Sequence, residues 1–228
     1  MDLILERCCT SFEQVREAAE CGAARVELCE CLEVGGVTPC EELIRAAVGV
    51  GGIAVNVLVR PRGGDFIYSA DEIAQMEESI RICRELGADG VVIGALTPEG
   101  EVDMSVMRRL IRAAREEGRP GAALSRPGPG RGVHGPGLSV TFHRAFDCAA
   151  DPFRALEDVI ALGCDRLLTS GQRNAAPQGR ELLKSLVSAA AGRIIIMPGS
   201  GVTPQNVRGL ASYCGAVEFH GTRLACRN

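Results

Sequence analysis

The sequence has no C-x-x-C pair, although it contains 11 cysteines. Structural zinc sites usually take ligands from such pairs, so their absence argues against one. No apolar run is long enough to span a bilayer. The first residues, MDLILERCC, place acidic side chains inside the segment where a signal peptide would be apolar. We therefore expect a cytoplasmic protein with reduced thiols and without a membrane partner.

The sequence also lacks the features of several large function classes. Its net charge is −4, so it offers no general basic surface for nucleic acid. No G-x-G-x-x-G stretch links a predicted strand to a following helix, which argues against a dinucleotide site. We find no known nucleophile motif. At 228 residues with 46% hydrophobic residues, the chain fits one large soluble domain, here taken as 1–228.

Short runs rich in β-branched residues recur along the chain and predict strands, with helical periodicity between them. Ser11, Ser69 and the pair Asp151-Pro152 are typical helix starts. The predicted strands cover 3–8, 25–29, 53–59, 90–94, 139–143, 165–169, 193–197 and 217–220, and the predicted helices cover 11–21, 40–48, 70–86, 103–116, 151–162, 179–190 and 203–212.

Eight strands that alternate with helices are the pattern of an α/β protein with a (β/α)8 barrel. A doubly wound sheet is the alternative, but it seldom needs eight strands. Two segments depart from the regular pattern. Residues 118–138 are rich in glycine and proline and predict a disordered insertion. After the last predicted strand, the remaining residues are too few for a full closing helix.

Polar side chains gather near the ends of the predicted strands. Residues two apart in a strand share a face, which groups Glu6 with Cys8, Glu27 with Cys29, and Glu218 with His220. His143 ends the fifth strand within the stretch TFHRAFD. Because helices cover the outside of a barrel, these side chains should point inward, near the mouth that barrel enzymes use. Structural ion pairs with Arg25, Arg60 and Arg166 are the alternative for the glutamates.

Two loops predict a site for an anion. Residues 60–66, RPRGGDF, offer Arg60, Arg62 and Asp65 around a Gly-Gly turn, and paired guanidinium groups suit a phosphate or a carboxylate. The second loop follows strand seven, where many barrels bind phosphate, and contains Gly199, Ser200 and Gly201.

The motifs, read in order, resemble those of one family. They are RVELCECLEVGGVTP, RPRGGDFIYS, GADGVVIGALTPEGEVD, TFHRAFD, DRLLTSGQ, RIIIMPGSGVTPQNV and VEFHGT, and they resemble the CutC copper homeostasis family over 1–117 and 139–221. The resemblance implies a TIM barrel, a cytosolic location and a role in copper handling. The insertion, the short C-terminus, and MPGSG in place of the usual MPGGG depart from the family's pattern.

Two functions from different classes remain open on the sequence, beside a third possibility, a ligand-binding scaffold with no turnover. In the first, the chain binds Cu(I) through Cys8 and Cys29 on neighbouring strands, with Cys31 as a third ligand. In the second, it is an enzyme acting on a small phosphate- or carboxylate-bearing substrate. There His143 or His220 would be the general acid or base, tuned by Glu27 or Glu218. A divalent metal bound by both histidines and a glutamate is a variant of this function. The expected partners are a copper ion or a small anion, and a homo-oligomer is open.

Overall fold

The computed structural model describes residues 3–116, 137–222 and 224. Its sheet contains eight strands, and each ladder joins parallel neighbours. The strands are β1 (Ile4–Cys9), β2 (Arg25–Leu28), β3 (Ala54–Leu58), β4 (Gly90–Ile93), β5 (Ser139–Phe142), β6 (Arg166–Thr169), β7 (Ile195–Pro198) and β8 (Glu218–Gly221).

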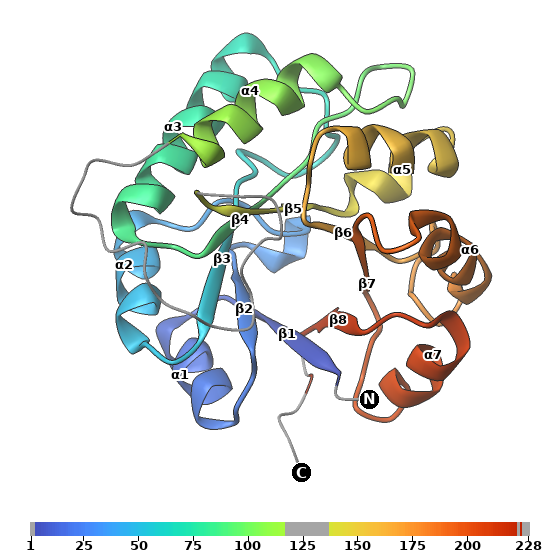
Figure 1. Cartoon of the computed structure of the whole chain (residues 1–228). Helices are drawn as coiled ribbons and strands as arrows, with labels where there is room; N and C mark the ends of the chain where they lie inside the picture. Colours follow the sequence, from blue (N-terminus) through green and yellow to red (C-terminus); the bar gives the residue numbers. More distant parts are fainter. Residues whose placement is uncertain (1–2, 117–136, 223, 225–228) are drawn as a thin grey trace.

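The helices surround the strands, as Figure 1 shows in a view along the barrel axis. The predicted start signals are confirmed: Ser11 accepts a hydrogen bond from the amide of Gln14, and Ser69 forms a reciprocal capping box with Glu72. The helices are α1 (Phe12–Glu20), α2 (Glu41–Val50), α3 (Ala70–Leu86), α4 (Met104–Arg115), α5 (Pro152–Ala161), α6 (Arg180–Ala190) and α7 (Val207–Cys214), with short 3₁₀ helices η1 (Leu32–Val34) and η2 (Arg144–Cys148).

The strand order closes the sheet into a nearly complete barrel. Strands follow one another from β1 to β7, and β8 returns to pair with β1, where Glu6 lies opposite His220. Within the described residues, no ladder joins β7 to β8. The predicted (β/α)8 fold is confirmed, and the parallel strands bring their carboxyl ends to one mouth.

The faces of the strands divide the molecule into two buried regions. Side chains such as Val26, Leu28 and Phe142 are buried in the main apolar core. The barrel interior instead holds a buried ionic cluster, which we call the interior ion network. In it Arg25 donates to Glu6 and Glu218, and Arg166 donates to Glu218 and to the hydroxyl of Ser139, at 2.7 and 2.8 Å.

The largest boundary difference concerns the segment after strand seven. The predicted helix 203–212 begins only at Val207, because the side chain of Asn206 accepts from the amide of Thr203 and closes a turn ahead of the helix. The predicted insertion 118–138 and the residues after the last strand, 222–228, fall mostly outside the described residues.

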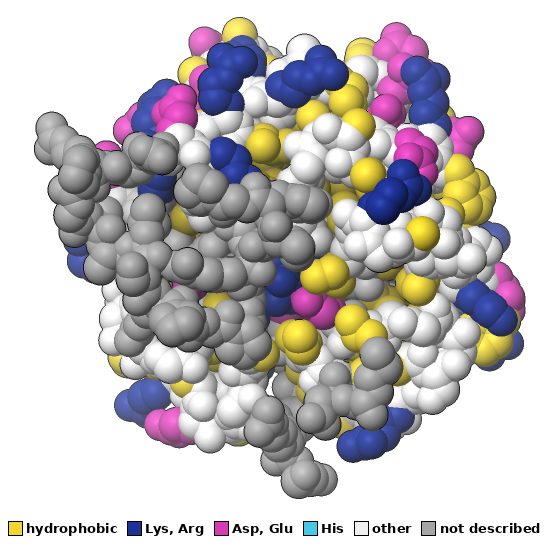
Figure 2. All heavy atoms as spheres, viewed as in Figure 1, with side chains coloured by type: hydrophobic (Ala, Val, Ile, Leu, Met, Phe, Trp, Pro, Cys, Tyr) yellow, Lys and Arg dark blue, Asp and Glu magenta, His cyan; other side chains and the backbone are white. Residues whose placement is uncertain are grey.

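On the face shown in Figure 2, basic and acidic side chains lie intermixed around the edge of the molecule. No helix among the described residues has both the length and the apolar character needed to cross a membrane.

Candidate functional site at the barrel mouth

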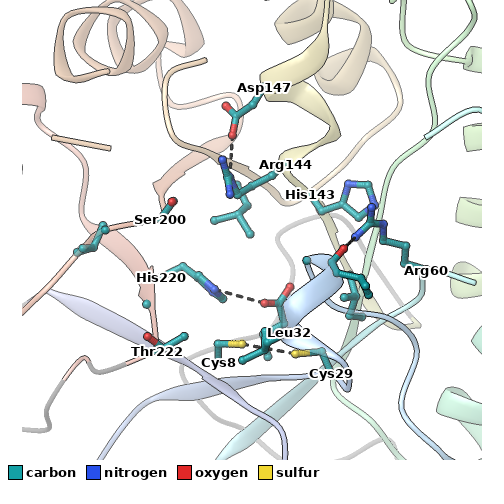
Figure 3. A pocket seen from close by; sticks show the side chains of 18 of the residues that line it. Cys8, Cys29, Leu32, Arg60, His143, Arg144, Asp147, Ser200, His220 and Thr222 are labelled. Atoms are coloured by element: carbon teal, nitrogen blue, oxygen red, sulfur yellow. Dashed lines mark hydrogen bonds and ion pairs between the residues drawn. The ribbon is translucent and has the colours of Figure 1, made fainter. Parts of the chain in front are cut away.

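A cavity of about 550 Å³ lies at the carboxyl ends of the strands, and we call it the mouth cavity. It brings together residues that are far apart in the sequence, as Figure 3 shows. Eight of the sequence-predicted site residues line it: Cys8, Glu27, Cys29, Arg60, His143, Ser200, Gly201 and His220.

Cys8 and Cys29 form a thiol pair in the cavity. Their sulfur atoms are 3.5 Å apart, and both side chains are almost completely buried. The pair forms because β1 and β2 are parallel neighbours in a register that sets Cys8 opposite Glu27, two residues before Cys29. The contact with the Cys29 thiol, together with burial, raises the pKa of Cys8 far above its usual range. Without a bound ion, Cys8 is therefore a protonated thiol.

His220 lies between two carboxylates. Its Nδ1 is 2.8 Å from Glu6 Oε1, and its Nε2 is 3.3 Å from Glu27 Oε2. Burial alone would favour the neutral ring, but Glu27 and Glu6 outweigh it and raise the pKa of His220 to about 9. Burial also raises the pKa of Glu27. His220 is thus an imidazolium at neutral pH, held by an ion pair at each nitrogen.

His143 has the opposite character. Its Nδ1 accepts a hydrogen bond from the amide of Ala145 at 3.1 Å, so the proton of the neutral ring is on Nε2. Burial and the nearby Arg60 guanidinium lower the pKa of His143 to about 3. No hydrogen-bond partner for Nε2 exists within the described residues. His143 is therefore a neutral donor, while general acid–base catalysis favours a pKa near 7.

Arg60 shares a wall of the cavity with His143 (Figure 3). Its guanidinium donates to the backbone carbonyls of Val34, Gly36 and Gly64 at 3.1, 3.1 and 2.8 Å. These bonds fasten η1 and the following turn to the end of β3. The side chain lies over the ring of Phe66, 4.8 Å from its centroid. Among the described residues, no carboxylate forms an ion pair with this buried cation, and the acidic side chains of its loop and of the start of α3, Asp65 and Glu72, pair with Arg62 instead.

The sequence analysis missed Arg144, Asp147 and Cys148, which also line the cavity. Asp147 accepts from the hydroxyls of Thr169 and Ser170 at 2.5 and 2.8 Å, and from Arg144 at 2.8 Å. These contacts tie η2 to the loop after β6. For Arg144 and Asp147 the signal was present in TFHRAFD, because a 3₁₀ turn directly after a barrel strand places its side chains at the mouth.

Other predicted residues lie elsewhere. Glu218 belongs to the interior ion network, so the structural alternative describes it better than a catalytic one. Arg62 pairs with Asp65 and Glu72 at 2.9 and 2.6 Å on the exposed side of their loop. Cys31 is exposed and precedes η1 in a left-handed conformation. Within the described residues, the lining of the mouth cavity does not include the predicted residues Glu218, Arg62, Asp65, Cys31 and Gly199.

Comparison with known proteins identifies the group to which this chain is related. The model of the CutC family matches residues 3–120 and 133–225. The chain belongs to the CutC family. It is 47% identical to a CutC family protein of Chromobacterium violaceum, over 97% of this chain and 81% of that relative. It is 46% identical to one from Histophilus somni, over 95% and 80%.

A solved structure agrees with the CutC assignment. The CutC protein of Streptococcus agalactiae, named for copper homeostasis, is 32% identical, with a TM-score of 0.85 over 98% of this chain and all of that one. An aldolase at 13% identity and a TM-score of 0.68 shows the shared fold alone. Residues 121–132, which the family model leaves unmatched, fall inside the predicted insertion.

The loop after β7 contains a residue with a left-handed backbone. Ser200 has a φ of 69°, in the region that glycine enters without strain. Its hydroxyl donates to the carbonyl of Asn174 at 2.8 Å, and its carbonyl accepts from Ala176. Ser200 therefore fastens the loop after β7 to the loop after β6 at the rim of the cavity.

In the described part of the chain, two sets of donor atoms at the mouth cavity could hold a metal ion. The first is the thiol pair of Cys8 and Cys29. The second combines Cys8, Glu27 and His220, whose ligand atoms all lie within 4.8 Å of one another. Soft thiolates favour Cu(I), whereas the mixed set suits a borderline ion such as Zn²⁺. In the second set the ion would have to replace the proton that now joins His220 to Glu27.

Proposed function

We propose that this chain acts in cytoplasmic copper homeostasis and binds Cu(I) between the sulfur atoms of Cys8 and Cys29. The observation that carries the proposal is the thiol pair, whose sulfurs are 3.5 Å apart at the base of a cavity. Cu(I) accepts few ligands and prefers sulfur, so two thiolates suffice. The copper role in the name of the related Streptococcus agalactiae protein supports the same assignment.

The surroundings of the pair suit a bound ion that must be taken up and released. Cys8 is 5% exposed and Cys29 is 1% exposed, so bulk thiols reach them poorly. The mouth cavity still gives a small ion a path to both sulfurs. Both thiols must lose their protons when they bind, and the one positive charge of Cu(I) replaces one of the two proton charges.

Substitution of either thiol should remove the tight Cu(I) site. We expect Cys8→Ser and Cys29→Ser each to abolish the binding that competes with a Cu(I) chelator such as bicinchoninate, because one remaining sulfur cannot bridge the ion. The measurement is an anaerobic competition titration on reduced, untagged protein. Cys83→Ser and Cys164→Ser are the matched controls, since both cysteines are buried but lie outside the mouth cavity.

The controls separate the proposed site from general thiol chemistry. Cys21 and Cys40 are exposed cysteines outside the mouth cavity, and we expect the chelator to outcompete such single thiols for Cu(I). If all four serine variants retain wild-type affinity, or lose it equally, Cys8 and Cys29 form no specific copper site.

A further inference from the structure

The mouth cavity is much larger than a metal ion requires. A volume of about 550 Å³ lies in the range of sites for small organic molecules. We propose that the cavity also binds an organic carboxylate, with its head group at Arg60 and His143 and its apolar part against the remaining walls. This inference does not rest on the proposed copper site, because the two sets of residues lie on different walls.

His143 supplies an oriented hydrogen-bond donor. The amide of Ala145 occupies Nδ1, and Gly94 leaves room for the ring: a Cβ there would come within 2.5 Å of Nδ1. Phe66, with its ring centroid 5.0 Å away, holds the imidazole from another side. The ring is therefore fixed while Nε2 lacks a partner within the described residues. A buried donor without an acceptor is costly, and an acceptor from a ligand would remove that cost.

Arg60 supplies the charge. Its hydrogen bonds to three backbone carbonyls fix the guanidinium. Asp65, whose pKa Arg60 helps to lower, is exposed and forms its ion pair with Arg62, so no carboxylate among the described residues forms an ion pair with Arg60. The Nε of Arg60 also lacks a hydrogen-bond partner there. The side chain is only 5% exposed, so water compensates the charge poorly. A ligand anion beside Arg60 would therefore gain a strong, charge-assisted interaction.

The charges near this wall favour a single negative charge on the ligand. Arg60 contributes one positive charge, His143 is neutral, and Arg144 is already paired with Asp147. A phosphate dianion would find no second free cation on this wall in the described part of the chain. The loop after β7 also does not lead directly into a helix N-terminus, since α7 begins at Val207.

The other walls suit an apolar body. They are contributed by side chains from several elements around the opening, of which Leu32 and Val34 in η1 are 44% and 47% exposed. Exposed apolar side chains at the rim of a cavity commonly contact a ligand. The apolar residues that line the cavity are Leu32, Val34, Leu58, Phe66, Leu168 and Val202.

Matched probes test the proposal on metal-free, reduced protein. Hexanoate, hexyl phosphate and 1-hexanol share one apolar chain and differ in the head group, and calorimetry or ligand-observed NMR measures their affinities. We expect hexanoate to bind at least about ten-fold more tightly than the other two. His143→Phe, which keeps the ring packing but removes the donor, and Arg60→Gln should each weaken hexanoate at least about ten-fold.

Control variants make each outcome decisive. Arg109→Gln removes an exposed cation, paired with Glu77 outside the cavity, and should bind hexanoate like the wild type. Arg60→Lys should recover part of the affinity that Arg60→Gln loses. If Arg60→Gln does not fold, the proposal is still tested by the hexanoate affinity of His143→Phe and by the affinities of the wild type for hexanoate and 1-hexanol. The proposal is wrong if hexanoate does not bind, if hexanol or hexyl phosphate binds as tightly, or if Arg109→Gln weakens binding as His143→Phe does.

Discussion

Replacing Arg25 by methionine should lower the free energy of unfolding by about 3–5 kcal/mol, as is typical when one partner of a buried ion pair is removed. The Arg25 side chain is completely buried and donates to Glu6 and to Glu218. Methionine has a similar length but leaves the charge of Glu6 without its main counter-charge inside the barrel. Urea unfolding monitored by circular dichroism measures the change.

Arg109→Met is the control for this experiment. Arg109 binds Glu77 through two hydrogen bonds of 3.0 and 2.9 Å, but the pair is exposed on the helices. Exposed pairs contribute about 0–1 kcal/mol, so this variant should stay close to the wild type. Equal effects of the two substitutions would show that the interior ion network does not hold the barrel together.

The stability of the protein should pass through a maximum near pH 6.5 because of the two histidines of the mouth cavity. The ordinary histidine pKa of 6.5 applies to the unfolded chain. The pKa of His220 is about 9 when folded, so its contribution is complete below pH 6.5 and is lost as the pH rises through 9. The pKa of His143 is about 3, so its contribution is complete above pH 6.5 and is lost as the pH falls toward 3.

The free energy of unfolding should fall by about 2 kcal/mol between pH 6.5 and 8 (the alkaline arm) and by about 2 kcal/mol between pH 6.5 and 5 (the acid arm). The reason is that one pKa unit corresponds to about 1.4 kcal/mol. Unfolding in urea at pH 5, 6.5 and 8 measures both. His220→Gln should flatten the alkaline arm only, and His143→Gln the acid arm only. An unchanged pH profile in both variants would contradict the charge states assigned to these rings.

The hydrophobic periodicity of the sequence and the alternation of its predicted strands and helices predicted much of this fold. The eight strands follow from short β-branched runs, and the two-residue period placed Glu27 and Cys29 on one face. The parallel register of β1 and β2 then brings Cys8 beside Cys29, as expected for neighbouring strands that reach the same mouth. These features depend on short stretches of sequence or on the order of the strands, so a single sequence is enough to predict them.

The depth of a side chain inside the barrel could not be predicted. Glu218 and His220 share a face of β8, yet Glu218 lies deeper and contacts Arg25 and Arg166 from other strands. The directions of the two arginine side chains in the loop after β3 could not be predicted either. Arg62 points to Glu72 at the start of α3, whereas Arg60 points inward. Both outcomes depend on contacts between residues distant in sequence, which no local pattern records.

X-ray absorption spectroscopy of the protein loaded with one equivalent of Cu(I) tests the proposed copper site most directly. If Cys8 and Cys29 hold the ion, the spectrum will show a first shell of two sulfur atoms, and the Cys8→Ser and Cys29→Ser variants will lose it while Cys83→Ser retains it. A shell of nitrogen or oxygen atoms, or a sulfur shell that survives both substitutions, would contradict the proposed Cu(I) site.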